Sequence, residues 1–390
     1  MRMIRNNKPL LYVATLLKSA LLMLWMMEDA LPTEVMSRKA LLGEMLFNDS
    51  RLSVPEGQAC AGCHSPEAAF TDPHSEYATS QGAIAGRFGV RNTPSIMYGS
   101  TTPRLHWSDE DDSWIGGQFR DGRVNTQKEQ AQKPVFNVLE MNNADPASLI
   151  EKIRTGPYAA QFLAVYGKDA FKDPIKALGM FGDAIQAYER TSIFQPFGSK
   201  YDRFLNGLAS LTSQEMRGLD IFVREDKGNC AACHPNQPSP TGKQRPLFTD
   251  FSYDNIGVPK NADNPFYQLP KDLNPLGNQF IDKGLGQTVK NNKYLGQFKV
   301  PTLRNIEKTA PYMHNGYFKT LRGVIEFYNT RDTRPLCRDG WTNDEEALKS
   351  GCWPGPEIST TVNRQELGHL RLTNAEIDDL LAFLHTLNDP

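Results

Sequence analysis

The sequence contains 390 residues, more than one hydrophobic core usually supports, so it predicts two domains. Its 43 basic and 45 acidic residues leave a formal net charge of −2, which argues against nucleic acid as a partner. The contents of hydrophobic (39%) and charged (23%) residues are typical of a globular protein and exclude a disordered or collagen-like chain.

The N-terminal segment has the pattern of an export signal. Three basic residues within its first eight positions precede an apolar run over residues 10–27, an order typical of a secretory signal peptide. The run approaches the ~20 apolar residues that span a bilayer, so an uncleaved anchor is the alternative. Lys18 disfavours it, because a charge near the middle of a membrane is costly. We expect residues 1–30 to be a signal peptide or N-terminal anchor and the protein to be periplasmic, with membrane association only if the segment stays uncleaved.

Two later segments resemble each other. Gly43–Phe47 precedes the motif C-x-x-C-H at Cys60–His64, and Gly218–Phe222 precedes a second copy at Cys230–His234. The two leading segments share the pattern G-x-x-[LI]-F, and the copies lie about one domain length apart. The repeat favours an ancient duplication, with a boundary near residues 199–210.

Helix signals support a mainly α fold. Capping boxes that begin at Thr212 and Thr373 predict helices over residues 216–223 and 377–387. Alternating strand patterns are scarce. Long stretches such as residues 65–102 are rich in Gly, Pro, Asn and Asp and are therefore expected to form irregular loops.

The motif C-x-x-C-H is typical of covalent attachment of a c-type haem. Two thiols at this spacing reach the vinyl groups of one porphyrin, and the next residue places an imidazole on the iron. A redox C-x-x-C pair or half of a zinc site is the alternative, but neither explains a histidine directly after both pairs. The sequence therefore predicts two covalently bound haem c cofactors, held by Cys60, Cys63 and His64 and by Cys230, Cys233 and His234.

Further blocks extend these motifs, namely Leu42–Ser53, Arg91–Ser95, Phe119–Arg123, Asn137–Met141, Val300–Asn305 and Thr309–Gly316. Together they resemble the bacterial dihaem cytochrome c peroxidase and MauG superfamily. The resemblance implies a mainly α fold of two cytochrome c-like haem domains with long irregular loops, related by duplication. A peroxide-reactive domain would cover residues 31–205 and a second domain residues 206–390. The resemblance also implies a calcium ion between the two domains and reaction with hydrogen peroxide.

The resemblance assigns residues to the peroxide site and to calcium. Relatives place a glutamate, here Glu140, over the open face of the first haem, where a carboxylate moves a proton during O–O cleavage. An exposed helical glutamate is the alternative. Gln130 and Pro134 would shape the pocket. Relatives supply calcium with one amide and two backbone oxygens, and the matching residues, which are also typical of turns, are Asn92, Thr309 and Pro311.

The far ligand of the second haem separates the branches of the family. Ordinary members have a methionine seventeen residues after the position of Pro311, and that count ends here at Tyr328. A phenolate lowers the reduction potential, and a tyrosine here is similar to the MauG branch. The alternative is that Tyr328 packs in the core and Met313 is the ligand. The loop 83–85 lacks the distal histidine of ordinary members, so we expect an open, five-coordinate first haem.

Two departures from the family concern aromatic residues. Arg120 stands where relatives carry a tryptophan between the haems, and its planar guanidinium would bind a haem propionate. The surface tryptophan of the MauG branch is also missing, and Trp107 and Trp114 are candidate substitutes. The remaining cysteines, Cys337 and Cys352, are expected to form a disulfide in an exported protein, with a free thiol pair as the alternative.

These observations favour a haem-dependent peroxidase of MauG-like character, which uses hydrogen peroxide to form high-valent haem and oxidises a tryptophan or tyrosine of a partner protein. One alternative is a cytochrome c peroxidase that takes electrons from a small donor cytochrome. Another is a non-catalytic dihaem electron-transfer protein, which Glu140 and the missing distal histidine disfavour.

Overall fold

The computed structural model describes residues 36–238 and 245–390, so the predicted signal peptide or anchor lies outside the described residues. Residues Arg38–Pro390 form one compact unit. Within the described ranges, none of the helices is long and apolar enough to span a membrane. The domain boundary expected near residues 199–210 stays a prediction.

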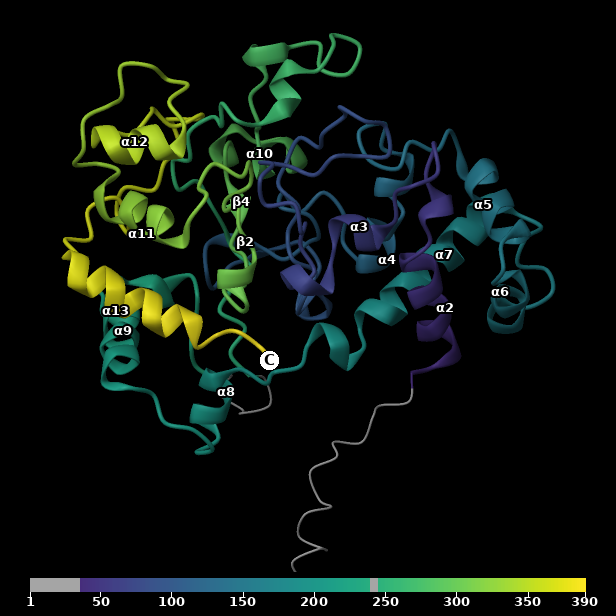
Figure 1. Ribbon diagram of the computed structural model, residues 1–390, viewed down its shortest axis with the longest axis horizontal. Helices are drawn as coiled ribbons and strands as arrows, with labels where there is room; N and C mark the ends of the chain where they lie inside the picture. The colour runs from purple at the N-terminus through teal and green to yellow at the C-terminus, as the bar shows by residue number, and fades with distance from the viewer. Residues whose placement is uncertain (1–35, 239–244) are drawn as a thin grey trace, which may run out of the picture. The chain divides into compact units, whose positions relative to one another are not determined.

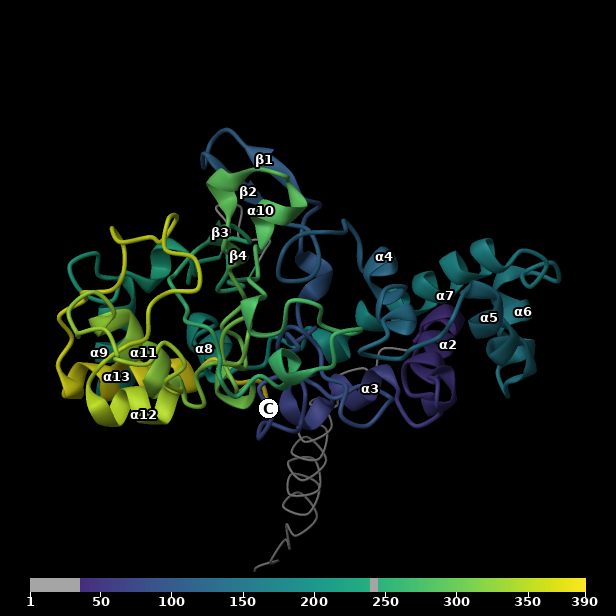
Figure 2. The ribbon, with the colours of Figure 1, turned by 90° about the horizontal axis from the view of Figure 1, so that it is seen from above.

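The described chain is mostly helical with few strands, as predicted (Figure 1). The helices are α2 (Arg38–Phe47), α3 (Cys60–Cys63), α4 (Gln127–Ala131), α5 (Pro146–Thr155), α6 (Ala159–Tyr166), α7 (Pro174–Glu189), α8 (Lys200–Leu205), α9 (Ser213–Val223), α10 (Leu285–Thr288), α11 (Leu321–Thr330), α12 (Asp344–Ser350) and α13 (Asn374–His385). Two antiparallel ribbons complete it, β1 (His106–Ser108) with β2 (Ser113–Ile115) and β3 (Tyr253–Asp254) with β4 (Phe298–Lys299). In Figure 2 the β1–β2 hairpin extends beyond β3 and β4, next to α10.

The repeated G-x-x-[LI]-F segments form α2 and α9, and each packs closely on a second helix. A Cβ atom on Gly43 would lie 2.0 Å from the carbonyl oxygen of Ala184 in α7, and one on Gly218 would lie 2.0 Å from that of Asp379 in α13. Only glycine permits so close an approach of two helix backbones. The same local pattern therefore produces the same helix contact twice, just ahead of each C-x-x-C-H motif.

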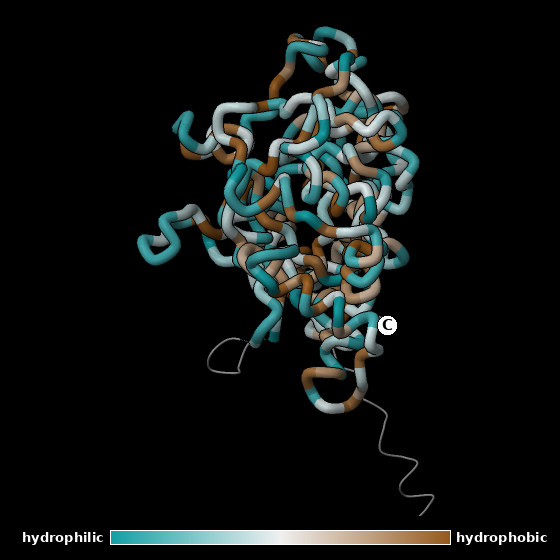
Figure 3. Tube along the Cα trace, turned by 90° about the vertical axis from the view of Figure 1, so that its left-hand side faces the viewer, coloured by the Kyte–Doolittle hydropathy of each residue, from teal (hydrophilic) through white to brown (hydrophobic). Residues whose placement is uncertain are grey.

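Aromatic residues fill the space beneath these contacts. The ring centroids of Phe47 and Tyr188 are 5.4 Å apart on α2 and α7, and those of Phe222 and Phe383 are 5.1 Å apart on α9 and α13. Phe248 packs in the same hydrophobic core as Phe222 and Phe383. Figure 3 shows hydrophilic residues, in teal, along the outlying loops and hydrophobic residues, in brown, along segments inside the body.

The predicted capping boxes and disulfide are confirmed. The side chain of Thr212 accepts from the backbone of Glu215 and that of Thr373 from Glu376, so the helices begin at Ser213 and Asn374, one turn earlier than the apolar pattern indicates. The last helix ends at His385 because Thr386 caps it. Cys337 and Cys352 form a disulfide bond.

Candidate functional site

The first C-x-x-C-H motif lines one cavity. Cys60 and Cys63 lie on the single turn of α3, and His64 follows directly as the C-cap of this helix. The Nδ1 atom of His64 is 2.9 Å from the carbonyl oxygen of Phe70, which leaves Nε2 free to bind a metal. Burial lowers the pKa of His64, so its imidazole is neutral, the form that binds iron.

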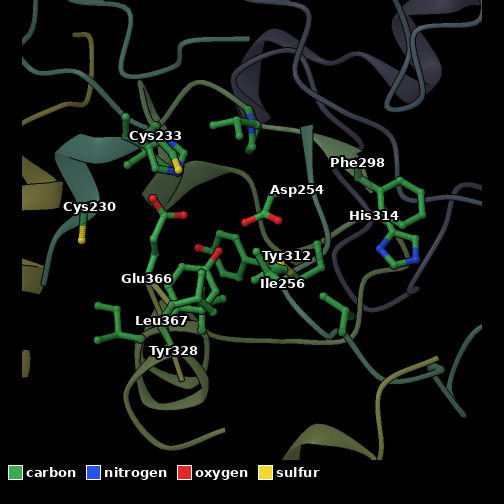
Figure 4. Close-up of a pocket in the computed structure, with 18 of the residues that line it drawn as sticks. Cys230, Cys233, Asp254, Ile256, Phe298, Tyr312, His314, Tyr328, Glu366 and Leu367 are labelled. Carbon is green, nitrogen blue, oxygen red and sulfur yellow. The ribbon is translucent and has the colours of Figure 1, made fainter. Parts of the chain in front are cut away.

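The second motif lines another cavity in the same way. Nδ1 of His234 is 2.8 Å from the carbonyl oxygen of Phe248, and burial lowers the pKa of His234 to about 4. Figure 4 shows Cys233, Asp254 and Tyr328 around this cavity. A thiol pair, an oriented neutral imidazole and a mostly apolar lining fit a covalently bound haem in each cavity.

Glu140 lies in the first cavity together with His64. It follows a tight turn in which Asn137 Nδ2 donates to Glu140 Oε1 at 2.6 Å. Burial raises the pKa of this carboxyl group, and the hydrogen bond from Asn137 opposes the rise. Gln130 and Pro134 line the same cavity, as expected of residues that shape a pocket. A carboxyl group with a raised pKa beside a reactive centre suits proton transfer near neutral pH.

The loop expected to lack a distal histidine packs against the backbone of Glu140. The backbone N–H of Ala83 donates to the carbonyl oxygen of Glu140 at 2.7 Å. All seven histidines belong to the described residues, and His64 alone among them lines the first cavity. His74 is exposed and lies beside Glu76, 3.4 Å away. No second imidazole of this chain therefore faces the first cavity.

Tyr328 and Met313 both line the second cavity. Tyr328 is on α11, and burial raises the pKa of its phenol, with further increases from the thiols of Cys230 and Cys233. Met313 also lines the first cavity, so it lies between the two. The positions of both residues are compatible with the two ligand hypotheses.

Arg120 lies between the cavities and lines both. Its Nε donates to the backbone carbonyl of Asn92 at 2.9 Å, and its Nη2 donates to Asn92 Oδ1 at 2.7 Å. Burial, with a smaller effect from Arg91, lowers the pKa of Arg120 to about 10, so the side chain stays charged at neutral pH. The amide oxygen expected to bind calcium is thus occupied by a cationic donor, and this arrangement does not fit the ion.

The other residues expected at the calcium site line the first cavity, whereas the two candidate tryptophans lie outside the lining of both cavities. Thr309 and Pro311 line the first cavity with Asn92, whose backbone N–H donates to the carbonyl oxygen of His314 at 2.8 Å. Trp107 and Trp114 face each other across the β1–β2 hairpin, with ring centroids 6.0 Å apart.

Three ionisable residues of the site were not predicted. Lys299 lines both cavities, and burial lowers its pKa to about 7 although Asp121 opposes the change. Glu189 lines the first cavity, and burial raises its pKa to about 8. Arg91 forms ion pairs with two acidic residues, Asp121 and Asp282, at 2.7 and 2.6 Å. Arg91 begins the block Arg91–Ser95, but the block assigns it no role, and all three residues acquire their roles from partners distant in the sequence.

Two c-type haem sites in one mostly helical chain define a dihaem c-type cytochrome. Residues 37–210 match the family Di-haem cytochrome c peroxidase. The chain is 37% identical over 357 residues to the methylamine utilization protein MauG of Paracoccus denitrificans, covering 90% of this chain and 88% of the relative. It is 28% identical to the cytochrome c peroxidase Ccp of Escherichia coli, covering 92% of this chain and 59% of the relative.

A solved structure agrees with these relatives. The diheme peroxidase BthA of Burkholderia thailandensis superposes with a TM-score of 0.75 and 36% identity, over 90% of this chain and 86% of that one. The chain therefore belongs to the dihaem cytochrome c peroxidase and MauG family. It is a haem-dependent peroxidase with two haem cofactors and hydrogen peroxide as its oxidant.

Proposed function

We propose that the protein is a periplasmic, MauG-like peroxidase that oxidises a residue of a partner protein. One observation carries the proposal: Tyr328 lines the second cavity with His234, whereas His64 is the single histidine of the first. When bound, the haem irons supply the oxidation and reduction chemistry with hydrogen peroxide.

The side chains of this chain would bind the cofactors and handle the proton. Each cysteine pair would attach one haem, and the neutral Nε2 atoms of His64 and His234 would bind the irons. Glu140 would take a proton from one peroxide oxygen and return it to the other, a transfer that its raised pKa favours. Tyr328 Oη would be the second ligand in the second cavity.

Replacing Glu140 with glutamine tests the proton transfer. The amide keeps the shape of the side chain but cannot accept and release a proton, so we expect peroxide to react about 10²–10⁴-fold more slowly. Stopped-flow absorbance after mixing with hydrogen peroxide measures this rate. Glu151→Gln, on the exposed face of α5, is the control and should react like the native protein. An unchanged rate in Glu140→Gln would remove the assigned role.

EPR spectroscopy separates the two ligand hypotheses. The oxidised native protein should show one high-spin and one low-spin haem, because His64 is the single histidine of the first cavity, whereas Tyr328 would supply a second ligand in the second cavity. Tyr328→Phe should alter the low-spin signal and Met313→Leu should leave it unchanged. The reverse pattern would identify Met313 as the ligand, and two low-spin signals in the native protein would contradict an open first site.

Trp107 and Trp114 are the proposed exit for oxidising equivalents. Tyr294 joins them, with its ring centroid 6.2 Å from that of Trp107. Tyr253, the neighbour in sequence of the cavity-lining Asp254, donates its Oη to the carbonyl oxygen of Gly116, the residue that follows the hairpin, at 2.5 Å. Both tryptophans are half-buried, so a partner protein would reach their edges.

The second candidate function is cytochrome c peroxidase activity, which relatives named as such favour. Steady-state turnover with peroxide and a reduced small cytochrome distinguishes the two. Rapid turnover that survives Trp107→Phe and Trp114→Phe would favour this candidate.

The matching Gly43 and Gly218 contacts support the further proposal that the two haem units arose by duplication.

A further inference from the structure

The contact between Arg120 and Asn92 joins two parts of the chain that meet between the cavities. The guanidinium binds both carbonyl oxygens of Asn92, one from the backbone and one from the side chain. The backbone N–H of the same asparagine binds the carbonyl oxygen of His314. The arginine is itself held in place, because Lys299 donates its backbone N–H to the carbonyl oxygen of Arg120 at 2.8 Å. The guanidinium itself joins two segments of the first half of the sequence, and the backbone hydrogen bonds of Asn92 and Arg120 extend this contact to His314 and Lys299 in the second half.

The charges around this contact oppose a second cation. The guanidinium of Arg120 is a cation held on Asn92 by two hydrogen bonds, and it lines both cavities. Asp121 and Asp282, two acidic residues that line the first cavity, are engaged by Arg91. The oxygens expected to bind calcium are neutral amide and carbonyl groups, which bind the ion without help from an ionised ligand. A fixed guanidinium on one of these oxygens removes its lone pair from the ion and adds electrostatic repulsion.

We propose that the guanidinium of Arg120 takes the place of the calcium ion between the two haem sites, so that this enzyme needs no calcium. The arginine is a cation that binds the same asparagine oxygen, and the backbones of Asn92 and Arg120 bind His314 and Lys299 of the second half, so this contact performs the linking role of the metal. The proposal rests on family membership and on this contact. It does not depend on which residue or partner the enzyme oxidises.

Calcium content and EPR spectra of the haem-loaded native protein test the proposal directly. After dialysis against EGTA, we expect well below one calcium per chain by elemental analysis, and unchanged high-spin and low-spin signals. One retained calcium per chain would overturn the proposal. So would EPR signals that change in EGTA and recover when calcium chloride is added.

Variants provide a second, independent test by calorimetric titration with calcium chloride. Arg120→Ala frees Asn92 Oδ1, so we expect it to bind one calcium ion and to need that ion for native EPR signals. The double variant Arg120→Ala with Asn92→Ala should bind none. Arg87→Ala is the matched control, because the Arg87 guanidinium binds the carbonyl oxygen of Val138, and it should stay calcium-free. Native EPR signals in Arg120→Ala without any calcium would overturn the linking role.

Discussion

At the scale of single residues, buried polar groups in this protein act through specific partners. The two haem-motif histidines show this, since each Nδ1 is engaged by one backbone carbonyl. Such a partner selects one orientation of the imidazole before a metal binds, which lowers the reorganisation needed on binding. Arg304 and Asp202 follow the same rule outside the two haem motifs. Both are buried, and two hydrogen bonds of 2.8 Å join them.

Replacing Asp202 with asparagine should destabilise the protein strongly. The variant leaves the buried charge of Arg304 without a counter-charge, and breaking a buried ion pair in this way costs about 3–5 kcal/mol of unfolding free energy. Urea denaturation followed by circular dichroism measures the change. Asp169→Asn, which breaks the exposed pair with Lys172, is the control and should have little effect. Equal effects of the two variants would contradict the assigned importance of burial.

At the scale of elements, glycines determine how closely the paired helices approach. Gly218 in α9 faces a backbone carbonyl of α13, and Gly43 in α2 faces one of α7. Gly179, also in α7, has only the far end of the Lys128 side chain nearby, at 3.9 Å. Helix propensity favours alanine at all three positions. At Gly218 and Gly43, close packing against the backbone of the neighbouring helix opposes alanine.

Glycine-to-alanine substitutions should therefore have opposite effects at these sites. Gly218→Ala should lower the unfolding free energy by about 1–3 kcal/mol, because the new methyl group forces the helices apart. Gly179→Ala should raise it by about 0.5–1 kcal/mol, because the helix gains propensity without a clash. Thermal denaturation of the haem-loaded variants gives both values. Similar stabilities of the two variants would show that the helix contact tolerates a methyl group.

At the scale of the whole molecule, Arg91 connects segments that are far apart in the sequence. Its guanidinium forms ion pairs with Asp121 from the first half and Asp282 from the second. Burial alone would raise the pKa of Asp282, but the charge and hydrogen bonds of Arg91 outweigh it and lower the pKa to about 2. A lowered carboxyl pKa stabilises the folded state above the ordinary value of 3.8, and this contribution disappears as the pH falls toward the folded value.

The acid dependence of stability tests this connection. Between about pH 5 and pH 3, the unfolding free energy of the native protein should fall more steeply than that of Asp282→Asn, which has no carboxyl group to protonate. At neutral pH the variant should be the less stable of the two, because Arg91 loses a counter-charge. Urea midpoints over this pH range provide the comparison, and parallel pH profiles would contradict the prediction.

The sequence by itself determined the features that depend on spacing along the chain. The two C-x-x-C-H motifs, the capping boxes at Thr212 and Thr373 and the pairing of Cys337 with Cys352 were all predicted. The haem motifs and capping boxes depend on residues a few positions apart in the sequence. The disulfide was predictable because Cys337 and Cys352 are the two cysteines outside the haem motifs. Glu140 and Tyr328 line separate cavities, and the roles that the family resemblance implies for them stay predictions.

Only the tertiary structure decided what surrounds the space between the cavities. The sequence shows Arg120 as a replaced tryptophan, but not that its guanidinium binds Asn92, 28 residues away along the chain. The buried Lys299, the raised pKa of Glu189 and the bridge through Arg91 were likewise absent from the predictions. These properties arise when long loops fold over one another, because burial and partner distance, which set the charge of a group, depend on packing between distant segments.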